Sequence, residues 1–354
     1  MGSCHLVVNV SEPSQVGDAR RTASRLAEQS GMGATASGKL GIVVTELANN
    51  LVRHAKGGDV LLRWTDEPEC GSGDGAGAGA AIETLAVDRG PGMADVARCL
   101  RDGFSTGGTA GTGLGAVRRL SADFGVHSGP AGTVVYSRVA ADETSAPSPA
   151  RRGEFEWGAV STAMPRETAC GDTWRVAARD GSLSIMVADG LGHGPLAAEA
   201  AAAAAVVFIR DPFAPLPDFV HAAHDALRAS RGAAIAVARI DLAGRVLRYV
   251  GVGNIAGTLL SAGNSRGLFS HNGTAGVQMR KVQEFEYPWP DDGLLVMHSD
   301  GLQTRWTFDA YPGLARQHPA LIAAVLHRDF SRGRDDATVV VARQNASRVN
   351  STEP

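Results

Sequence analysis

Residues 182–195, SLSIMVADGLGHGP, join an apolar segment to an alanine-rich one through a run of glycines. The mostly apolar stretch 183–187 has the length of a buried strand and ends just before Asp189. Glycine then alternates with other residues up to Gly194, and an alanine-dominated helix is predicted over 196–210. A carboxylate at a strand end, beside backbone that only glycine allows, can hold a hard divalent cation, although Asp-Gly pairs also form ordinary turns. The segment predicts a strand–turn–helix unit with a candidate metal ligand at its turn.

The length of the chain favours two domains. It has 354 residues, and a domain usually has roughly 100–200. Residues 141–153, ADETSAPSPARRG, combine proline, serine, alanine and charge without an apolar period, and we interpret them as a linker. The expected domains are 1–140 and 154–343, followed by a disordered tail over 344–354.

Composition argues against several classes of protein. The net charge of −3 argues against binding to nucleic acid or to a membrane surface through bulk electrostatics. No apolar run approaches the roughly 20 residues that span a bilayer, and no signal segment opens the chain. The four cysteines lie far apart without a C-x-x-C pair, which fits reduced thiols better than disulfides or a zinc site. We therefore expect a cytoplasmic protein, and the glycine- and alanine-rich composition is compatible with a GC-rich bacterial genome.

Hydrophobic periodicity predicts an α+β fold for both halves. In the first half, helices are expected over 17–30, 36–54 and 117–123, and strands over 5–10, 59–64, 82–87 and 132–139. This pattern is typical of a mixed sheet with helices on one face. In the second half, strands are expected over 156–163, 172–178, 182–188, 233–240, 246–250, 256–260, 294–299 and 338–343, with helices over 196–210, 217–230 and 315–327. That half predicts a β-sandwich flanked by helices.

Three features of the first half indicate a nucleotide site. Glu46 and Asn50 lie four residues apart, so both side chains leave the same face of a mostly apolar helix. Asp88 follows a strand and opens the tight turn Asp-Arg-Gly-Pro-Gly. The segment 111–115, GTGLG, opens a helix, where free N–H groups and the positive helix end attract phosphate.

The segments TELANNLVRHA, DRGPGM and GTGLGAVRRL resemble the N, G1 and G2 boxes of the GHKL ATPase superfamily. The resemblance covers roughly residues 5–140 and is greatest to the RsbT-like serine kinases of anti-sigma-factor and stressosome systems. It implies that Asn50 binds the Mg²⁺ of ATP, that Asp88 receives the adenine amino group, and that Glu46 is the general base for a serine or threonine hydroxyl. The glycines that it assigns to the nucleotide are Gly90, Gly92, Gly111, Gly113 and Gly115.

Other interpretations of these residues stay open. A G-x-G-x-G segment by itself is more often a flexible turn, and it does not directly follow a strand here. His54 continues the row of Glu46 and Asn50, and is interpreted as a packed or solvent-facing residue more readily than as a catalyst. A domain that binds ATP as a sensor, without kinase activity, is a further alternative.

Four aspartates of the second half stand at the ends of expected strands, namely Asp172, Asp189, Asp300 and Asp336. Oxygen ligands without a cysteine or histidine cluster select Mg²⁺ or Mn²⁺ over zinc. Several carboxylates that converge in an interior repel one another unless cations neutralise them. Two such ions about 3.5–4 Å apart can share a water and activate it for in-line attack on phosphorus.

The order of these motifs resembles that of the metal-dependent PPM-type serine/threonine phosphatases, in particular the SpoIIE-like branch and its RsbX-like stressosome members. The resemblance spans about residues 154–343 and rests on DGLGHGPLAAEAA and GVGNIAG. It implies that Asp189 bridges two metal ions and that the Gly190 carbonyl coordinates one of them. It further implies that Asp300 and Asp336 complete the ligand set, and that Asp172 contributes directly or through water.

Four further residues are weaker candidates for this site. His193 is a candidate proton donor to the leaving oxygen, or else a loop histidine that caps the next helix. Asp335 is a neighbour of the ligands, and Asn254 is expected to stabilise a turn. No arginine is clearly placed to bind the substrate phosphate, and Arg166 is only a guess.

The predicted function is metal-dependent dephosphorylation of a serine or threonine in a partner protein. By the resemblance, that partner is a STAS-domain antagonist or stressosome protein that controls a sigma factor. The first domain either phosphorylates the same class of partner or gates the phosphatase through ATP occupancy. The alternative from another class is a non-catalytic ATP-dependent anti-sigma or switch module whose second half is a scaffold. The oligomeric state stays open.

Overall fold

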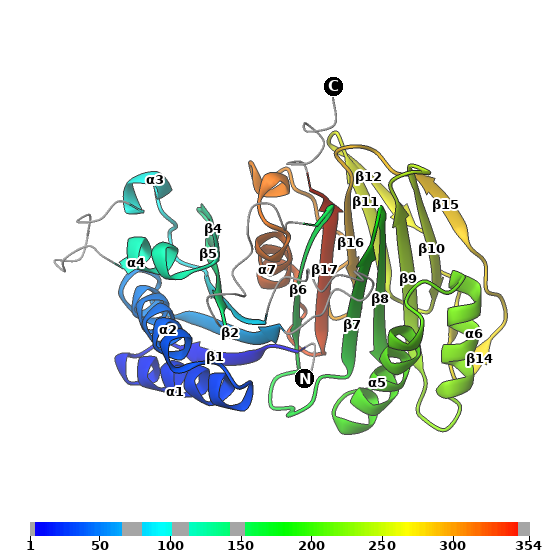
Figure 1. Ribbon diagram of the computed structural model, residues 1–354, viewed down its shortest axis with the longest axis horizontal. Coiled ribbons are helices and arrows are strands. Elements are labelled where there is room, and N and C mark those ends of the chain that lie inside the picture. The colour runs from blue at the N-terminus through cyan, green and yellow to red at the C-terminus, as the bar shows by residue number, and fades with distance from the viewer. Residues whose placement is uncertain (1–3, 66–79, 101–112, 142–152, 346–354) are drawn as a thin grey trace.

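The computed structural model describes residues 4–65, 80–100, 113–141 and 153–345. Its elements form successive layers (Figure 1): helices of the first half, one sheet, a single helix, two facing sheets, and an outer pair of helices. No helix in these described ranges has both the length and the apolar character needed to cross a bilayer. The expected linker, the tail after residue 345 and the glycine-dense stretch after residue 65 lie wholly or mostly outside the described residues.

The first sheet has the strand order β1-β2-β3-β5-β4. Its strands are β1 (Leu6–Val10), β2 (Gly58–Thr65), β3 (Ala81–Asp88), β4 (Asp123–Gly129) and β5 (Gly132–Ala140). All four pairings are antiparallel, so the expectation of a mixed sheet is wrong for the strands described. Strand β4 was not expected, because its sequence DFGVHSG has neither an apolar run nor a clean alternation.

Helices of the first half cover one face of this sheet. They are α1 (Pro13–Gln29), α2 (Ala34–Ala55) and α4 (Gly113–Leu120), while α3 (Val96–Cys99) is a single turn. Helix α2 directs Leu40, Val44 and Leu47, all fully buried, toward the alternate strand residues Val60 and Leu62. This spacing of apolar residues is what makes α2 the central helix of the layer.

The opposite face of the same sheet is also apolar, and it is covered by a helix of the second half. Helix α7 (Pro319–Phe330) packs against this face and, on its other side, against strands β6 (Phe155–Thr162) and β17 (Ala337–Gln344). Its residues are buried all round, as expected of a helix between two sheets. The shared core includes Leu61, Leu85 and Tyr136 from the first half. In Figure 1, α7 lies between the two halves.

The second half is a sandwich of two five-stranded sheets. One sheet has the order β15-β10-β9-β8-β7 and the other β12-β11-β16-β17-β6. The strands are β6 (Phe155–Thr162), β7 (Asp172–Arg179), β8 (Ser182–Gly190), β9 (Ala233–Asp241), β10 (Val246–Val252), β11 (Ala256–Ser261), β12 (Asn264–Leu268), β15 (Phe285–Pro288), β16 (Leu294–His298) and β17 (Ala337–Gln344), with the small pair β13 (Gly273–Thr274) and β14 (Gln278–Met279) outside it. Strands β12 to β15 are short or largely polar, and the sequence did not predict them.

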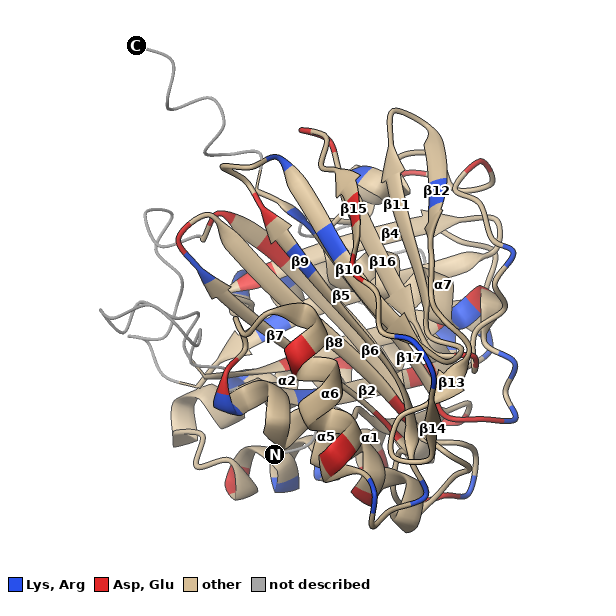
Figure 2. Ribbon diagram, turned by 90° about the vertical axis from the view of Figure 1, so that its right-hand side faces the viewer, with Lys and Arg blue, Asp and Glu red and all other residues tan. Residues whose placement is uncertain are grey.

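Two helices cover the outer face of the β7–β10 sheet. They are α5 (Pro195–Arg210) and α6 (Leu216–Ala226), and Figure 2 shows them lying across this sheet with few charged residues. The alanines of α5 let it approach β8 closely, since a methyl group added at Gly190 would lie 2.1 Å from the Ala197 carbonyl oxygen. The predicted sandwich with flanking helices is therefore confirmed.

Polar groups also join the two halves. Arg63 of β2 pairs with Glu83 of β3, and its guanidinium carbon lies 4.8 Å from the ring centre of Trp174. The His5 backbone N–H donates to the Ser161 carbonyl at 2.7 Å, and its ring Nδ1 also contacts Ser161. Burial, followed by the charge of Arg63, lowers the pKa of His5 to about 3.

We expect the free energy of unfolding to fall as the pH drops from 6.5 toward 3. Folded His5 stays neutral in this window while the unfolded histidine takes up a proton, so the unfolded state binds more protons. Its share of the loss is about 2 kcal/mol at pH 5. Urea unfolding at pH 7.5 and 5 should show a smaller drop for His5→Asn than for the wild type, and His54→Asn is the exposed control. An equal drop in all three proteins would contradict the assignment.

Candidate functional site

The two helices expected to frame a nucleotide lie together. Glu46 and Asn50 are half-buried on α2, and α4 begins opposite them at Gly113. A methyl group added at Gly113 would lie 3.0 Å from Glu46 Oε2 and 3.9 Å from Asn50 Oδ1. The structure therefore brings the acid and the amide to the first turn of α4, where backbone N–H groups are free to meet phosphate.

Asp88, the last residue of β3, has a defined carboxylate position. Its Oδ1 accepts hydrogen bonds from the backbone N–H groups of Gly90 at 2.8 Å and Thr133 at 2.9 Å. Both bonds end on Oδ1, and no hydrogen bond reaches Oδ2 from the described residues. Gly90 is needed because an added methyl group would lie 2.9 Å from Ala55 of α2. Gly92 has a φ of 75°, and a methyl group there would lie 2.2 Å from the Gly129 carbonyl oxygen.

The remaining predictions for this site have mixed outcomes. Gly113 and Gly115 lie in the first turn of α4, whereas Gly111 is outside the described residues. His54 is exposed at the end of α2, in keeping with a solvent-facing residue.

The structure gathers the four aspartates of the second half at neighbouring strand ends. Asp172 begins β7 and lies directly opposite Asp189 on β8. Asp300 follows β16, and Asp336 precedes the adjacent strand β17. The two sheets are tied together here, because the Ser299 hydroxyl donates to Asp172 Oδ2 at 2.6 Å. Segments far apart in the sequence thus place their carboxylates at one end of the sandwich.

Mutual repulsion in this cluster is visible in the pKa values. Burial, together with the charges of Asp172, Asp300, Asp335 and Asp336, raises the pKa of Asp189 to about 9. Burial also raises the pKa of Asp172 to about 7, although hydrogen bonds from Ser299 and Thr338 oppose the shift. In such a buried group, each carboxylate disfavours the charged form of the others. A bound cation would stabilise those charged forms.

The donor set fits hard divalent cations. Asp172 Oδ1 is buried and has no hydrogen-bond partner in the described part of the chain. However, no three Asp, Glu, His or Cys side chains of the described residues already converge as a ligand set. Asp336 instead accepts N–H bonds from Met164 and Gly171, each at 2.8 Å. These side chains would therefore have to rotate to bind a metal ion together.

Other candidate residues have clear positions. Asn254 Nδ2 donates to Asp300 Oδ2 at 2.7 Å, a contact that its turn-like sequence, VGNIAG, did not reveal. His193 Nδ1 lies 2.7 Å from Glu167 Oε1, so it contacts a carboxylate and does not cap α5. Burial raises the pKa of Asp335, with the charge of Asp300 adding to it. Arg166 is exposed, with a φ of 77°.

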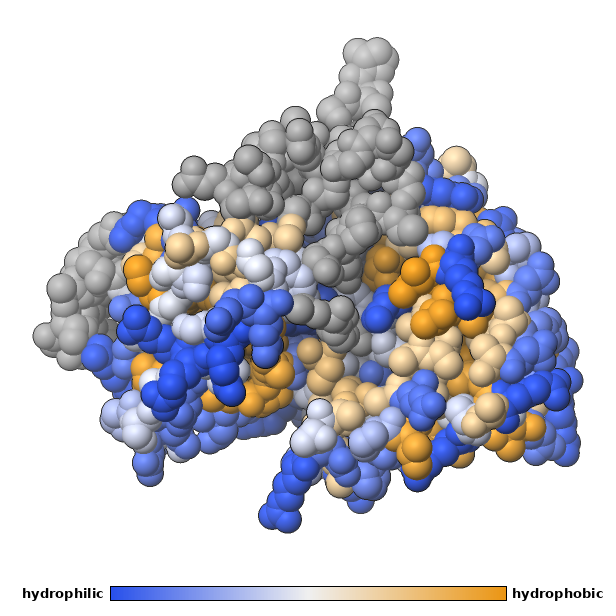
Figure 3. Space-filling view, turned by 60° about the horizontal axis from the view of Figure 1, so that its bottom comes forward, coloured by the Kyte–Doolittle hydropathy of each residue, from blue (hydrophilic) through white to orange (hydrophobic). Residues whose placement is uncertain are grey.

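A cleft of about 1230 Å³ runs between the two halves. Its lining includes Asp88 and Arg89 from the nucleotide side and Asp172 and Asp335 from the acidic cluster, together with Arg166 at the rim. Figure 3 shows the molecule hollowed between its halves on this face. The cleft therefore reaches Asp88 of the first site and Asp172 and Asp335 of the acidic cluster.

Comparisons with known proteins match the two halves separately. The family profile of the histidine kinase-like ATPase domain matches residues 10–139, and that of Stage II sporulation protein E (SpoIIE) matches residues 179–345. A solved chain from a study of the bacterial stressosome as a modular system is 30% identical, covers 54% of this chain and 100% of its own length, and has a TM-score of 0.50.

Two curated relatives come from Bacillus subtilis (strain 168). The serine/threonine-protein kinase RsbT is 31% identical over 111 residues, which cover 31% of this chain and 76% of that kinase. The phosphoserine phosphatase RsbX is 28% identical over 137 residues, which cover 38% of this chain and 69% of that phosphatase. The chain therefore belongs to the RsbT-related histidine kinase-like ATPases through its first half, and its second half matches the SpoIIE family and is similar to the phosphatase RsbX.

Proposed function

We propose that this protein hydrolyses phosphoserine or phosphothreonine in a partner protein with the help of two Mn²⁺ or Mg²⁺ ions. The observation that carries the proposal is that Asp172 and Asp189 lie directly opposite each other on neighbouring strands, with pKa values raised to about 7 and about 9. Uncompensated carboxylates of this kind destabilise a fold, so their clustering supports a site built for cations.

Each residue of the cluster has a proposed task. Asp189 and the Gly190 carbonyl would hold the ions, and Asp300 and Asp336 would complete the ligands. Asp172 contributes directly or through water, and the Ser299 hydroxyl fixes its orientation. When bound, the ions supply charge neutralisation and activate water for in-line attack on phosphorus. Asn254 holds the Asp300 carboxylate in place.

The first half is proposed to bind ATP with Mg²⁺. Asn50 would hold the metal, Asp88 would accept a hydrogen bond from the adenine amino group, and Glu46 would take the proton from an acceptor hydroxyl. The position of the Asp88 carboxylate, fixed by the N–H groups of Gly90 and Thr133, supports this placement. The phosphates are assigned to Gly111, Gly113 and Gly115.

The partner is proposed to be a phosphorylated STAS-domain antagonist or stressosome protein in a sigma-factor pathway. The support is the likeness of one chain to both a serine/threonine-protein kinase and a phosphoserine phosphatase. A protein that carries both activities would set the phosphorylation level of one target. We propose a cytoplasmic location, with domains at 1–140 and 154–343.

The test follows phosphate onto and off a STAS protein incubated with the full chain. We expect Mn²⁺-dependent release of phosphate from the phosphorylated protein, loss of release with EDTA, and recovery when Mn²⁺ is restored. Label transfer from the γ-phosphate of ATP should fall in Glu46→Gln. If neither the phosphoprotein nor p-nitrophenyl phosphate is hydrolysed at any Mn²⁺ concentration, the second half is a non-catalytic scaffold.

A further inference from the structure

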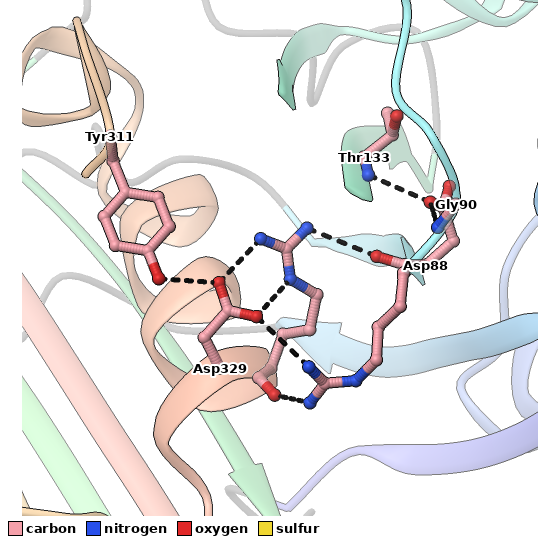
Figure 4. Close-up of polar contacts among 7 residues, drawn as sticks. Asp88, Gly90, Thr133, Tyr311 and Asp329 are labelled. Atoms are coloured by element: carbon pink, nitrogen blue, oxygen red, sulfur yellow. Dashed lines mark hydrogen bonds and ion pairs between the residues drawn. The ribbon is translucent and has the colours of Figure 1, made fainter. Parts of the chain in front are cut away.

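The C-terminal end of helix α7 is bonded to the turn that carries Asp88. Arg328 Nη1 donates to the Asp88 backbone carbonyl at 3.2 Å. In return, Arg89 donates to the Arg328 carbonyl through Nη2 and to Asp329 Oδ1, at 3.3 Å, through Nη1. Figure 4 shows these contacts, which we name the α7 junction: Asp88, Arg89, Arg328, Asp329 and Tyr311.

The α7 junction is buried and fixed on its helix side. Arg328 binds Asp329 in bidentate fashion, with Nε–Oδ1 and Nη2–Oδ2 distances of 2.8 and 2.7 Å. The Tyr311 hydroxyl donates to Asp329 Oδ2 at 2.9 Å. The side chains of Arg328 and Asp329 are only 3% and 10% exposed. Charge-assisted bonds in such surroundings are strong and hold one geometry.

On its other side, the α7 junction includes Asp88, which opens the turn after β3. Asp88 offers its carboxylate to Gly90 and Thr133 while its carbonyl accepts from Arg328. A methyl group added at Gly132 would lie 2.0 Å from that carbonyl oxygen, so the surroundings of the turn leave little space. A ligand that shifts Asp88 would therefore also shift the acceptor of Arg328.

The chain that leaves α7 contacts both loops of the acidic cluster. Gln303 N–H donates to the Phe330 carbonyl at 2.9 Å, and Arg332 N–H donates to the Gly301 carbonyl at 2.8 Å. Gly301 follows Asp300, and a methyl group added there would lie 1.9 Å from the Asp336 carbonyl oxygen. The end of α7 thus holds the Asp300 loop and leads directly into Asp335 and Asp336.

We propose that nucleotide occupancy of the first half regulates metal binding in the second half through the α7 junction. This inference rests on the proposed function. Because the junction bonds both sites to the end of α7, a ligand that stabilises the bound geometry of one site also stabilises that of the other, and the two bind with positive cooperativity. We expect bound ADP to lower the Mn²⁺ concentration for half-maximal phosphatase activity about fivefold or more, and Mn²⁺ to strengthen ADP binding equally.

The experiment uses the full chain and two readouts. The first is amide hydrogen exchange of residues 328–336 in Mg²⁺ alone and in Mg²⁺ with ADP, and ADP should slow it. The second is the Mn²⁺ dependence of p-nitrophenyl phosphate hydrolysis at buffered free Mn²⁺, with and without ADP. ADP affinity of every variant is measured by calorimetry, so that lost coupling is distinguished from lost binding.

The variant Arg89→Gln removes the contacts that Arg89 makes within the α7 junction. Its side chain is 67% exposed. It should bind ADP yet show neither response, and Arg89→Lys should restore part of both. The matched control is Arg228→Gln, an arginine 68% exposed that pairs with Asp225 elsewhere. Because Arg89 neighbours Asp88, Asp329→Asn provides a second variant on the phosphatase side.

The outcomes separate the coupling from the phosphatase. If ADP binds but changes neither readout in the wild type, or if Arg89→Gln and Asp329→Asn respond fully, the coupling is refuted while the phosphatase stands. If no hydrolysis occurs but ADP still slows exchange at 328–336, the proposed function fails and the physical link remains. The proposal is supported if the wild type and Arg228→Gln both respond to ADP while Arg89→Gln and Asp329→Asn do not.

Discussion

Asp189→Asn is expected to lower kcat/KM for phosphoprotein hydrolysis about 10³-fold or more. The charge stabilisation that metal ions supply to such a reaction amounts to several kcal/mol, and about 4 kcal/mol corresponds to 10³-fold in rate. Asparagine keeps the shape of the side chain but removes the charge that the proposed metal-binding role needs. The measurement is steady-state hydrolysis of a phosphorylated STAS protein across a range of Mn²⁺ concentrations.

Loss of activity by unfolding is distinguishable from loss of a ligand. Because burial disfavours the charged form of Asp189, the metal-free variant should unfold at an equal or higher temperature than the wild type. The rise in Tm that Mn²⁺ gives to the wild type should be absent. Asp180→Asn, an exposed residue in the turn of the same β7–β8 hairpin, is the matched control. A variant at Asp189 that retains turnover and the Mn²⁺-induced shift would refute the metal assignment.

Leu321→Ala is expected to destabilise the whole chain by about 2–5 kcal/mol. Leu321 is fully buried on α7, and a methyl group added at Gly125 of β4 would lie 2.7 Å from its Cδ1. Its side chain fills the layer between the first sheet and the sandwich, so truncation leaves a cavity that both halves border. Urea unfolding followed by fluorescence and circular dichroism measures the effect.

The control for this change is Leu196→Ala, a leucine that is 53% exposed on α5 and should cost little. We expect the Leu321 variant to lose stability in one transition that includes both halves. Two separate transitions, with only one displaced, would show that the halves fold independently.

Much of the local structure was predictable, because periodicity is a local signal. Helix α2 and strands β8 and β17 have apolar spacings that fix their type, and their bounds differ from expectation by at most two residues. The positions of Asp88 and Asp189 near the ends of strands were predictable because each follows a largely apolar run. The antiparallel pairing and the polar strand β4 were not, since strand partners are chosen by contacts between distant segments.

The position of α7 illustrates what the sequence leaves undetermined. Helix 315–327 was expected, but as a flank of the sandwich alone, and the structure begins it at Pro319. The runs VLLRW of β2 and TVVYSRV of β5 carry apolar residues on both faces, which indicates a sheet covered on both sides. Which helix covers the second face depends on long-range packing. The same holds for Asn254 and Arg89, whose partners lie 46 and 240 residues away.

The two-sided sheet also bears on how such a chain can be divided. Cutting between the halves would leave Leu61, Leu85 and Tyr136 facing water, because their cover belongs to the other piece. An excised first half would then expose an apolar face of its sheet. It would tend to self-associate or to bind another apolar surface in place of α7. Because α7 of the second half completes the core of the first half, neither half could be inherited alone unless the surface exposed by the separation acquired polar residues.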